Sequence, residues 1–600
     1  MTFARFFASR TPATLRRVFT SIDLFPIRHV VRNYDAGKLR ADSRAAFNVA
    51  LVAFPQGLAF AMIAGLPISF GLFGSAIAGV IGALFAGSRF VIPGPTNGTA
   101  VLTLSAFLAS GATEAEMAAL IPLLLVIVGT MQIAAAYLNV GSLISYISRA
   151  VIVGYISSAA VLIIVNEVKN LTGIAVPREA TLFGVLSATV VRLGSTHWAT
   201  AAVSAATAVT YLLLRRFLPK LPNLALAMVA SIGFGIATQK LGHPVKMLPS
   251  VPVSSFSISI PQVDFAEINK LASAALALAF LAILEAASIG KSLAARAGER
   301  LYTNQEIFSL GVANLGCSLF GGMPASGSLT RSALSVNSGA VTSMASLIIG
   351  LLSFVMIFGL GSLVGYVPRA ALTVVVVFAA VSLIHVRQIQ FVIRATPTDA
   401  AVFIVTAGSA LLFPLDTTIF IGAATSIVLF LNKAGEPELV EYVFTDEGQL
   451  AALRSADKRP LPEISIVHVE GSLFFGAAEL LQEQVRRVCD DPNLRIIILR
   501  LKFAHHLDAS AILALEELVQ SMRENGRGLI VSGARKEVYR ICKRTGLVDL
   551  IGRENFFLEW PKNPTLSTRN ALKRAQQILG QKEADIRVFD EMRTKAPGAG

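Results

Sequence analysis

Long apolar runs, broken by Gly, Pro and isolated charges, fill the first two thirds of the chain. Between Arg44 and Glu114 the only charged residue is Arg89, which leaves apolar chain for two or three spans of roughly 20 residues each. Similar runs continue with short breaks to about Asn432. Because backbone in lipid must satisfy its hydrogen bonds internally, the pattern predicts about 14 membrane helices. The expected segments begin near Ala45, Gly71, Pro95, Ala118, Leu143, Phe183, Trp198, Asn223, Leu271, Thr303, Gly327, Val341, Pro368 and Asp399.

The pattern changes after Asn432. Beyond it, short apolar runs alternate with amphipathic ones, which is typical of an α/β layer with a mixed or parallel sheet. Strands are expected at 463–471, 494–502 and 528–534, and helices at 477–488, 509–525 and 536–546. The predicted organisation is a lead-in at 1–44, a membrane domain at 45–432, a linker at 433–459, an α/β domain at 460–562 and a basic tail at 563–600.

Composition supports a membrane protein. Hydrophobic residues make up 54% of the chain and charged residues 15%, too little charge for the surface of a soluble protein this long. The net charge of +14 comes from Lys and Arg at span ends and in the tail, which fits cytoplasmic loops better than a nucleic-acid surface. The basic N-terminus has no long apolar core before Ala45, so no cleavable signal is expected.

No catalytic or metal-binding pattern stands out. The three cysteines form no CxxC pair, and the chain holds no HExxH, nucleophile elbow or kinase motif set. The string ASIGKS at 287–292 ends like a phosphate-binding loop, but Glu285 stands where the first glycine is needed. The chain is therefore predicted not to be an enzyme, and no metal or cofactor is expected.

Two short segments differ from the rest. TNGTAVLTLSAFL (96–108) follows PGP, and SGSLTRSALSV (326–336) follows GGMP; each is too short to span a bilayer alone. Paired, Gly/Pro-interrupted short segments in the two halves of a membrane domain point to a transporter's midplane site. A purely structural pair of re-entrant loops is the alternative.

A helix that begins inside the membrane presents unpaired N–H groups and a partial positive charge. Two such ends facing each other make an anion site. Ser326, Ser328 and the Thr96–Asn97 pair are expected to cap these ends or to donate to a ligand. Arg331 adds a full positive charge, and its alternative role is a snorkelling end-cap.

Three motifs together resemble the sulfate permease (SulP) family. They are VAFPQGLAFAMIAGLPISFGLFGS (52–75), SRFVIPGPTNGTAVLTL (88–104) and GCSLFGGMPASGSLTRSAL (316–334), and the resemblance reaches back to YDAGKLRAD (34–42). It implies two inverted repeats of seven segments, forming core and gate domains that move like an elevator, and a homodimer. It also implies that the anion sits between the third and tenth segments.

By motif match, the resemblance implies a substrate site that draws on the first, third and tenth segments. The substrate-binding candidates are Gln56, Phe60, Thr96, Asn97, Gly98, Thr99, Ser328, Thr330 and Arg331. Many animal members carry an aromatic residue after the Gly-Pro pair. Here Thr96 and Asn97 make the site more polar, which argues against a preference for chloride alone.

Glu285 is the single acid deep in the apolar run ALAFLAILEAASIGK (277–291). By motif match it lies at the family position where an acid or a sodium-site carboxylate sits on the eighth segment. The resemblance therefore makes it the best candidate for coupling to a cation, and it could take up a proton with the substrate. An ion pair with Lys291 or Arg331 is the rival interpretation.

The C-terminal pattern resembles a STAS domain. In anti-sigma-factor antagonists a serine in an Asp-x-Ser turn is phosphorylated, and LDASA (507–511) places Asp508 and Ser510 at that turn. Ser510 is therefore a candidate regulatory site; a plain helix cap at Asp508 or Ser510 is the alternative.

These observations predict a secondary active transporter of inorganic oxyanions, with sulfate as the substrate, a proton as a possible coupling ion, and no nucleic-acid partner. The N-terminus and the STAS domain would lie on the cytoplasmic side of the inner (plasma) membrane, surrounded by lipid. Open alternatives are a sodium-coupled bicarbonate or dicarboxylate transporter, an uncoupled anion conductance, and a non-transporting anion sensor that signals through the STAS domain.

Overall fold

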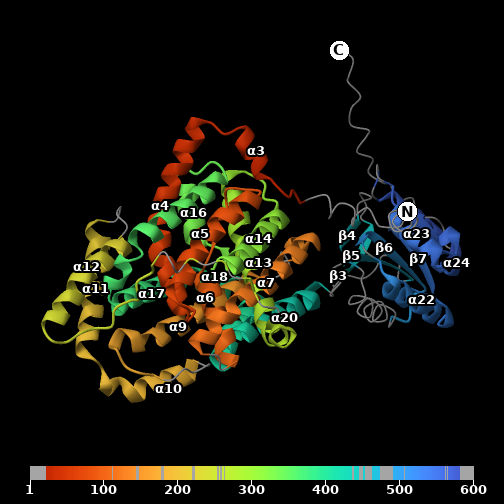
Figure 1. Cartoon of the computed structure of the whole chain (residues 1–600). Helices are drawn as coiled ribbons and strands as arrows, with labels where there is room; N and C mark the ends of the chain where they lie inside the picture. Colours follow the sequence, from red (N-terminus) through yellow and green to blue (C-terminus); the bar gives the residue numbers. More distant parts are fainter. Residues whose placement is uncertain are drawn as a thin grey trace, which may run out of the picture. The chain divides into compact units, whose positions relative to one another are not determined.

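A computed structural model of the chain describes residues 22–580 apart from short gaps, of which 453–462 and 473–490 are the longest. The chain divides into two compact units, Met1–Ser426 and Ile427–Gly600. The first is a bundle of helices, and the second is a sheet flanked by helices (Figure 1). Each is described here by itself.

The first unit contains two short β-strands among its helices. The first half has α3 (Ile27–Arg32), α4 (Ala36–Ile63), α5 (Ile68–Phe85), β1 (Pro93–Gly94), α6 (Asn97–Ser110), α7 (Glu114–Tyr137), α8 (Val140–Leu143), α9 (Arg149–Thr172), α10 (Leu182–Arg192), α11 (Trp198–Phe217) and α12 (Asn223–Lys240). The second half has α13 (Phe265–Ala297), α14 (Thr303–Leu319), β2 (Ser326–Gly327), α15 (Leu329–Asn337), α16 (Met344–Leu360), α17 (Arg369–Leu383), α18 (Val386–Ala395), α19 (Pro397–Leu412) and α20 (Leu415–Ala434).

Six helices of the described residues are long and apolar enough to cross a membrane, and a bent pair, Gly184–Ser195 and Trp198–Phe217, makes a possible seventh. The sequence-based figure of about 14 segments counted every apolar run. Several of these runs form shorter helices, such as Met344–Leu360 and Pro397–Leu412. These two helices have 17 and 16 residues, fewer than the roughly 20 that a helix needs to cross a bilayer alone.

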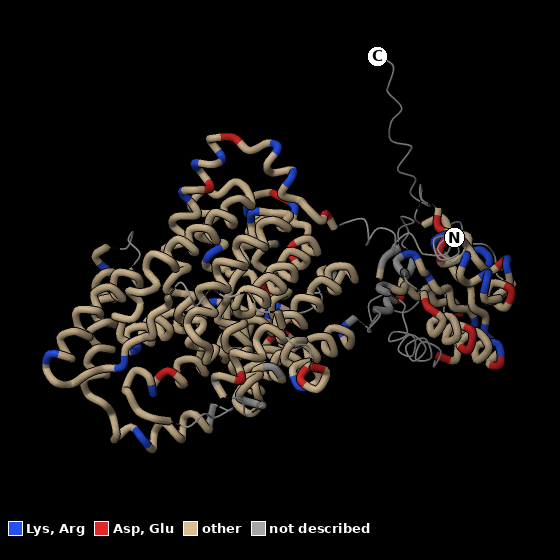
Figure 2. The backbone as a smooth tube through the Cα atoms, viewed as in Figure 1, with Lys and Arg blue, Asp and Glu red and all other residues tan. Residues whose placement is uncertain are grey.

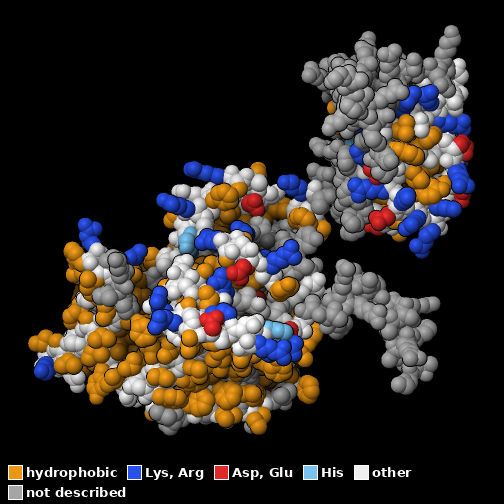
Figure 3. Space-filling model, turned by 90° about the horizontal axis from the view of Figure 1, so that it is seen from above, with side chains coloured by type: hydrophobic (Ala, Val, Ile, Leu, Met, Phe, Trp, Pro, Cys, Tyr) orange, Lys and Arg blue, Asp and Glu red, His pale blue; other side chains and the backbone are white. Residues whose placement is uncertain are grey.

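Charged residues are sparse in the helical unit and gather at the turns and helix ends (Figure 2). Seen from above, Lys and Arg side chains dot one face, whereas the side towards the bottom of the view is a nearly continuous hydrophobic surface (Figure 3). A contiguous apolar surface of this extent on a helical bundle is suited to lipid.

The two halves of the unit repeat one arrangement. The order α4–α5–β1–α6–α7 corresponds to α13–α14–β2–α15–α16. Packing follows the same correspondence: α5 contacts α16 as α14 contacts α7, and α6 contacts α13 as α15 contacts α4. The antiparallel pairing of β1 with β2 lies where the two repeats meet. This is the pseudo-two-fold relation expected of inverted repeats.

Two polar side chains, the buried Asp42 and the partly exposed Arg89, hold the loop that follows α15. The Asp42 carboxylate, 0% exposed, accepts hydrogen bonds from the N–H groups of Val341 (2.8 Å) and Thr342 (3.2 Å). From the other side, Arg89 donates to the Ala340 carbonyl (2.6 Å) and to Glu299 (2.6 Å). The C-terminal end of the short helix α15 is thereby tied to α4 and to the segment before β1.

The second unit is built on a six-stranded mixed sheet in the order β4-β3-β5-β6-β7-β8, in which the pairings from β5 to β8 are parallel and those of β3 antiparallel. Its elements are β3 (Glu438–Phe444), β4 (Leu450–Ala452), β5 (Ile464–Ser472), β6 (Ile496–His505), α22 (Ala509–Glu524), β7 (Gly528–Ala534), α23 (Lys536–Arg544), α24 (Leu547–Ile551), β8 (Phe556–Leu558) and α25 (Leu566–Leu579).

The three predicted strands and the helices at 509–525 and 536–546 are present, whereas the helix expected at 477–488 lies outside the described residues. Two stretches differ from their expected roles. Part of the supposed linker 433–459 forms β3, whose alternating ELVEYVF pattern pairs with β5. The supposed tail 563–600 contains α25, whose Ala571, Leu572 and Ala575 pack on the sheet. In both cases partners distant in the chain supply the stabilisation.

Candidate functional site

The antiparallel pairing of β1 with β2 brings the two short helices α6 and α15 together. Pro93 pairs with Gly327 and Gly94 with Ser326, and the Ser328 N–H donates to the Ile92 carbonyl (3.1 Å). Since α6 begins three residues after β1 and α15 two residues after β2, this antiparallel pairing directs both helix N-termini into one region. The sequence-based expectation that two truncated helices meet at a common site agrees with this geometry.

The start of α6 is stabilised by a reciprocal pair of threonines. The Thr99 N–H donates to Thr96 Oγ1 (3.2 Å), and the Thr96 N–H donates to Thr99 Oγ1 (3.1 Å). The N–H groups of Asn97 and Gly98 donate to no described residue. These two donors at the positive end of α6 are therefore available to a ligand.

The start of α15 is less capped. Ser328 is the N-cap residue but makes no side-chain capping bond, and the N–H groups of Leu329, Thr330 and Arg331 donate to no described residue. Gln56 on α4 approaches Thr330, with its Nε2 3.4 Å from Thr330 Oγ1. These backbone N–H groups at the start of α15 add to those at the start of α6 as donors available to a ligand.

A cavity of about 880 Å³ lies at these helix ends. One wall is formed by α6, α13 and the start of α15, and the opposite wall by α9, the end of α17, α18 and the start of α19. Of the predicted substrate residues, this cavity is lined by Phe60, Thr96, Asn97, Gly98, Ser328 and Thr330. It thus lies between two groups of helices that belong to different parts of the bundle.

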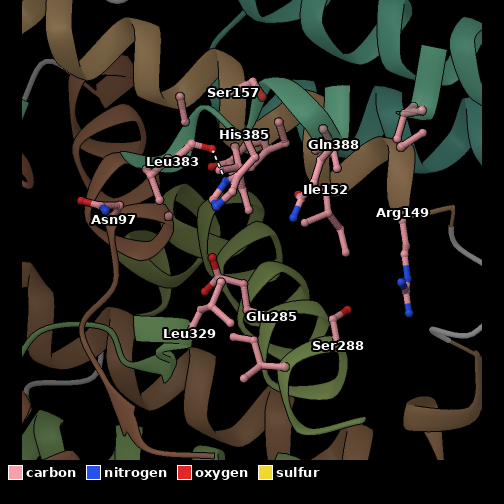
Figure 4. A pocket seen from close by; sticks show the side chains of 18 of the residues that line it. Asn97, Arg149, Ile152, Ser157, Glu285, Ser288, Leu329, Leu383, His385 and Gln388 are labelled. Carbon is pink, nitrogen blue, oxygen red and sulfur yellow. Dashed lines mark hydrogen bonds between the residues drawn. The ribbon is translucent and has the colours of Figure 1, made fainter. Parts of the chain in front are cut away.

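Glu285 reaches the same cavity from α13 (Figure 4). Its Oε2 accepts hydrogen bonds from the hydroxyls of Thr96 (3.1 Å) and Ser326. No ion pair joins it to Lys291 or Arg331 among the described residues. The carboxyl group therefore stands between the two helix starts, where it takes part in hydrogen bonding rather than in a salt bridge.

Arg331 does not line the cavity. Its side chain is 1% exposed, Nη2 donates to the Pro95 carbonyl, and Nε has no partner among the described residues. A Cβ on Gly94 would lie 3.0 Å from Arg331 Cζ, so glycine is needed there for the guanidinium to pack against the backbone. The positive charge of Arg331 thus lies against the backbone of Gly94 and Pro95 and is not part of the cavity lining.

Two other predicted residues also stand outside the cavity lining. Thr99 is 1% exposed because its hydroxyl is used in the cap of α6, and Gln56 faces Thr330 with its Oε1 buried and without a described partner. In the second unit, Asp508 caps α22 by accepting from the Ala511 N–H (2.9 Å). Ser510 follows it on the helix and is exposed.

Sequence reasoning missed the residues that α9 and α18 contribute to the cavity. These include Arg149 and His385, which lie on the wall opposite Glu285 (Figure 4). The His385 Nδ1 lies 3.0 Å from the Leu383 carbonyl oxygen, which can only accept, so Nδ1 is the donor in this hydrogen bond. No local motif marks these residues.

No group of three or more His, Cys, Asp or Glu side chains suited to a metal occurs within the described residues. The chemistry available at the cavity comprises backbone N–H groups, hydroxyls, the amides of Asn97 and Gln388, the carboxyl groups of Glu285 and Asp399, and the basic side chains of Arg149, His385 and Arg387. Such a set binds and releases an anion by hydrogen bonding and helix dipoles.

Comparison with known families gives two matches. The model described as the sulfate permease family matches residues 39–406, and that of the STAS domain matches residues 455–561. Sulfate transporter 4.1, chloroplastic, of Arabidopsis thaliana is 26% identical over 558 residues, covering 89% of this chain and 81% of the relative. The putative sulfate transporter YvdB of Bacillus subtilis is 24% identical over 529 residues, covering 88% and 97%.

Solved structures share the fold. The murine Slc26a9 anion transporter in its inward-facing state aligns with a TM-score of 0.81 at 19% identity, over 92% of this chain and 94% of that one. The transmembrane domain of the cyanobacterial bicarbonate transporter BicA aligns with a TM-score of 0.58 at 20% identity, over 66% of this chain and 98% of that one. At these identities the likeness shows the fold alone.

Proposed function

This chain belongs to the sulfate permease family, and on that premise we propose that it is a secondary active transporter of inorganic oxyanions, with sulfate as its substrate. Membership confirms the predicted fold, a helical membrane domain followed by a STAS domain, and the prediction that the chain is not an enzyme. The chain is thus a multi-pass membrane protein of a transporter family.

One observation carries the proposal: the β1–β2 pairing directs the starts of α6 and α15 into one cavity, and each start has backbone N–H groups that donate to no described residue. Two free N–H groups at α6 and three at α15, with the hydroxyl of Thr330, offer donors from two directions. A tetrahedral dianion has acceptor oxygens on all sides, so it can satisfy both helix ends at once. The names of the similar curated proteins, which are sulfate transporters, support the same substrate.

The position of Glu285 supports coupling to protons. Its carboxyl group lies between the starts of α6 and α15, where it accepts hydrogen bonds from the hydroxyls of Thr96 and Ser326. A carboxylate and a dianion in the same water-poor site repel each other. We therefore propose that Glu285 binds a proton when the anion is bound and that both are carried together.

The cavity separates the helices α6, α13 and α15 from α9, α17, α18 and α19. This division supports an elevator-type movement in which the first group carries the anion past the second. We place the chain in the plasma membrane with the N-terminus and STAS domain in the cytoplasm, because basic residues such as Arg40 and Arg300 flank the spans.

The test is uptake of labelled sulfate by the purified chain in proteoliposomes, with bicarbonate, chloride and succinate as competitors, at two pH values and with or without sodium. We expect saturable sulfate uptake driven by an inward proton gradient and indifferent to sodium. Sodium dependence with bicarbonate or succinate as the better substrate would replace the proposal by the alternative transporter. Anion binding without flux would indicate a sensor.

Glu285→Gln and Arg331→Ala are expected to abolish net uptake while the protein still inserts into the membrane. Glu267→Gln is the matched control, since Glu267 lies on the same helix in an exposed pair with Lys270 (2.7 Å). Full uptake in either variant would remove that residue from the mechanism.

A further inference from the structure

Arg149 is a charged residue of the cavity that the proposed mechanism does not use. It is the first residue of α9, directly after the N-cap Ser148, whose Oγ accepts from the Ala150 N–H (3.1 Å). A cation in the first turn opposes the helix dipole and costs about 0.3–1 kcal/mol. A residue that breaks a local rule in this way is more often functional than structural.

The guanidinium of Arg149 has no hydrogen bond or ion pair to the described residues. Asp399, a carboxylate of the cavity lining, already accepts from the hydroxyls of Ser148 (2.7 Å) and Thr396 (2.9 Å). Five N–H donors in a planar fork are therefore free to meet a ligand.

Ser288 and Ser292 line the same cavity from α13, three and seven residues after Glu285. Serines and threonines elsewhere in these helices bond back to a carbonyl, as Ser158 does to Gly154 (2.9 Å) and Thr207 to Val203 (2.8 Å). Neither Ser288 nor Ser292 makes such a bond within the described residues. Their hydroxyls remain available as donors.

Figure 4 shows Arg149 and Ser288 towards the right of the view, on different helices. Arg149 extends from its helix on the side where Ser288 lies, whereas Asn97 marks the α6 start on the other side. His385 lies between them, with its Nδ1 held by the Leu383 carbonyl.

We propose that Arg149, Ser288 and Ser292 form a second anion site in the cavity, separate from the two helix starts, that binds an inorganic dianion. This inference rests on the proposed anion transport and adds an outer position to it. An anion held there bridges α9 and α13, which belong to the two walls of the cavity. The second site binds the anion as it enters from solution, before the anion reaches the inner site between the two helix starts.

The site owes its selectivity to charge. The Coulomb energy of an anion near Arg149 is proportional to the anion's charge, so the factor lost by a dianion on neutralising Arg149 is the square of that lost by a monoanion. For a charge about 7 Å away in water, these factors are about threefold for a monoanion and about tenfold for a dianion. A structural role of Arg149 would affect both anions equally.

The experiment compares Arg149→Gln, Arg149→Lys and the control Arg192→Gln, which removes an exposed basic residue of α10 outside the cavity. In proteoliposomes, Arg149→Gln should raise the KM for labelled sulfate about tenfold and the inhibition constant of nitrate about threefold. Arg149→Lys, which keeps the charge but loses the planar fork of donors, should lie between Arg149→Gln and the wild type. Arg192→Gln should stay close to the wild type. The difference in KM between Arg149→Gln and the wild type should shrink as the concentration of an inert salt is raised, because the salt screens the charge of Arg149.

Thermal stabilisation of the detergent-solubilised chain by sulfate is measured in parallel, because it reports binding without flux. Arg149→Gln should need about tenfold more sulfate than Arg192→Gln for the same stabilisation. Equal behaviour of these two variants, or an equal loss for sulfate and nitrate, overturns the second site. Stabilisation of the wild type by sulfate without any uptake would instead overturn the proposed function and leave the second site standing.

Discussion

Gly98 lies against the carboxyl group of Glu285 at the start of α6, so a single methyl group there perturbs the site without touching the fold. A Cβ built on Gly98 would lie 2.6 Å from Glu285 Oε1 and 3.0 Å from Leu281 Cδ2. Both neighbours are the ends of flexible side chains, which can move aside. We therefore expect Gly98→Ala to insert and fold normally but to displace the carboxyl group.

The size of the effect follows from these distances. Ordinary contact between a carbon and an oxygen requires the carboxyl group to retreat by about 0.8 Å from its 2.6 Å approach. The hydrogen bond from Thr96, now 3.1 Å long, would then exceed the range of a normal bond. Losing one hydrogen bond to a charged group costs about 1.5–3 kcal/mol, which corresponds to a loss of about 10-fold to 150-fold in proton-driven sulfate uptake.

The assay is initial sulfate uptake under a proton gradient, with Gly233→Ala and Gly408→Ala as controls. Both control glycines lie in helices and have no atom within 4 Å of the added Cβ, so both variants should transport like the wild type. Glu285→Asp, which shortens the side chain, should partly restore uptake in the Gly98→Ala background. Wild-type uptake by Gly98→Ala would refute the role assigned to the Glu285 carboxyl group.

Two further predictions concern the loop after α15 and the STAS domain. Asp42→Ala removes the acceptor of the Val341 and Thr342 N–H groups, at a cost of about 2 kcal/mol, so the rate of amide hydrogen exchange in that loop should rise about 30-fold. An unchanged exchange rate would contradict the role assigned to Asp42. Burial, together with Arg500 and Lys502, lowers the pKa of His468 to about 4, below its ordinary 6.5. The unfolded chain then binds more protons, so the STAS domain should lose stability as pH falls from 6.5 towards 4, as followed by Trp560 fluorescence in a Trp198→Phe background; His468→Gln should flatten this dependence.

The paired short helices were predictable from the sequence because their breakers are local. PGP before Thr96 and GGMP before Ser326 interrupt apolar runs, and the helices begin at Asn97 and Leu329 as the pattern indicates. The alternating runs of the STAS domain carry a local signal of the same kind. Such features depend on a few adjacent residues, so one sequence is enough to find them.

The direction in which individual side chains point was not predictable from the local sequence. Arg331 follows Thr330 on a nine-residue helix, and the sequence does not say which of the two meets the cavity; the structure turns Thr330 into it and Arg331 behind the β1–β2 crossing. Thr99 is likewise turned into the cap of α6. A step of one residue rotates a helical side chain by about 100°, so packing against other helices decides the outcome.

Residues brought to the site from afar carried no signal. The pattern around Arg149 indicates a basic residue at a span end, and only its place in the lining of the cavity that Ser288 also lines suggests another role. Strand β3 and helix α25 were missed for a related reason, since β5 and the apolar face of the sheet stabilise them across long stretches of chain.

The most direct measurement is a structure of the chain determined with selenate, whose anomalous scattering marks the position of the oxyanion. We expect a peak within hydrogen-bonding distance of the backbone N–H groups at the start of both α6 and α15, next to Glu285. A selenate bound elsewhere in the cavity, with both helix starts unoccupied at saturating concentration, would contradict the claim that these two ends hold the transported anion.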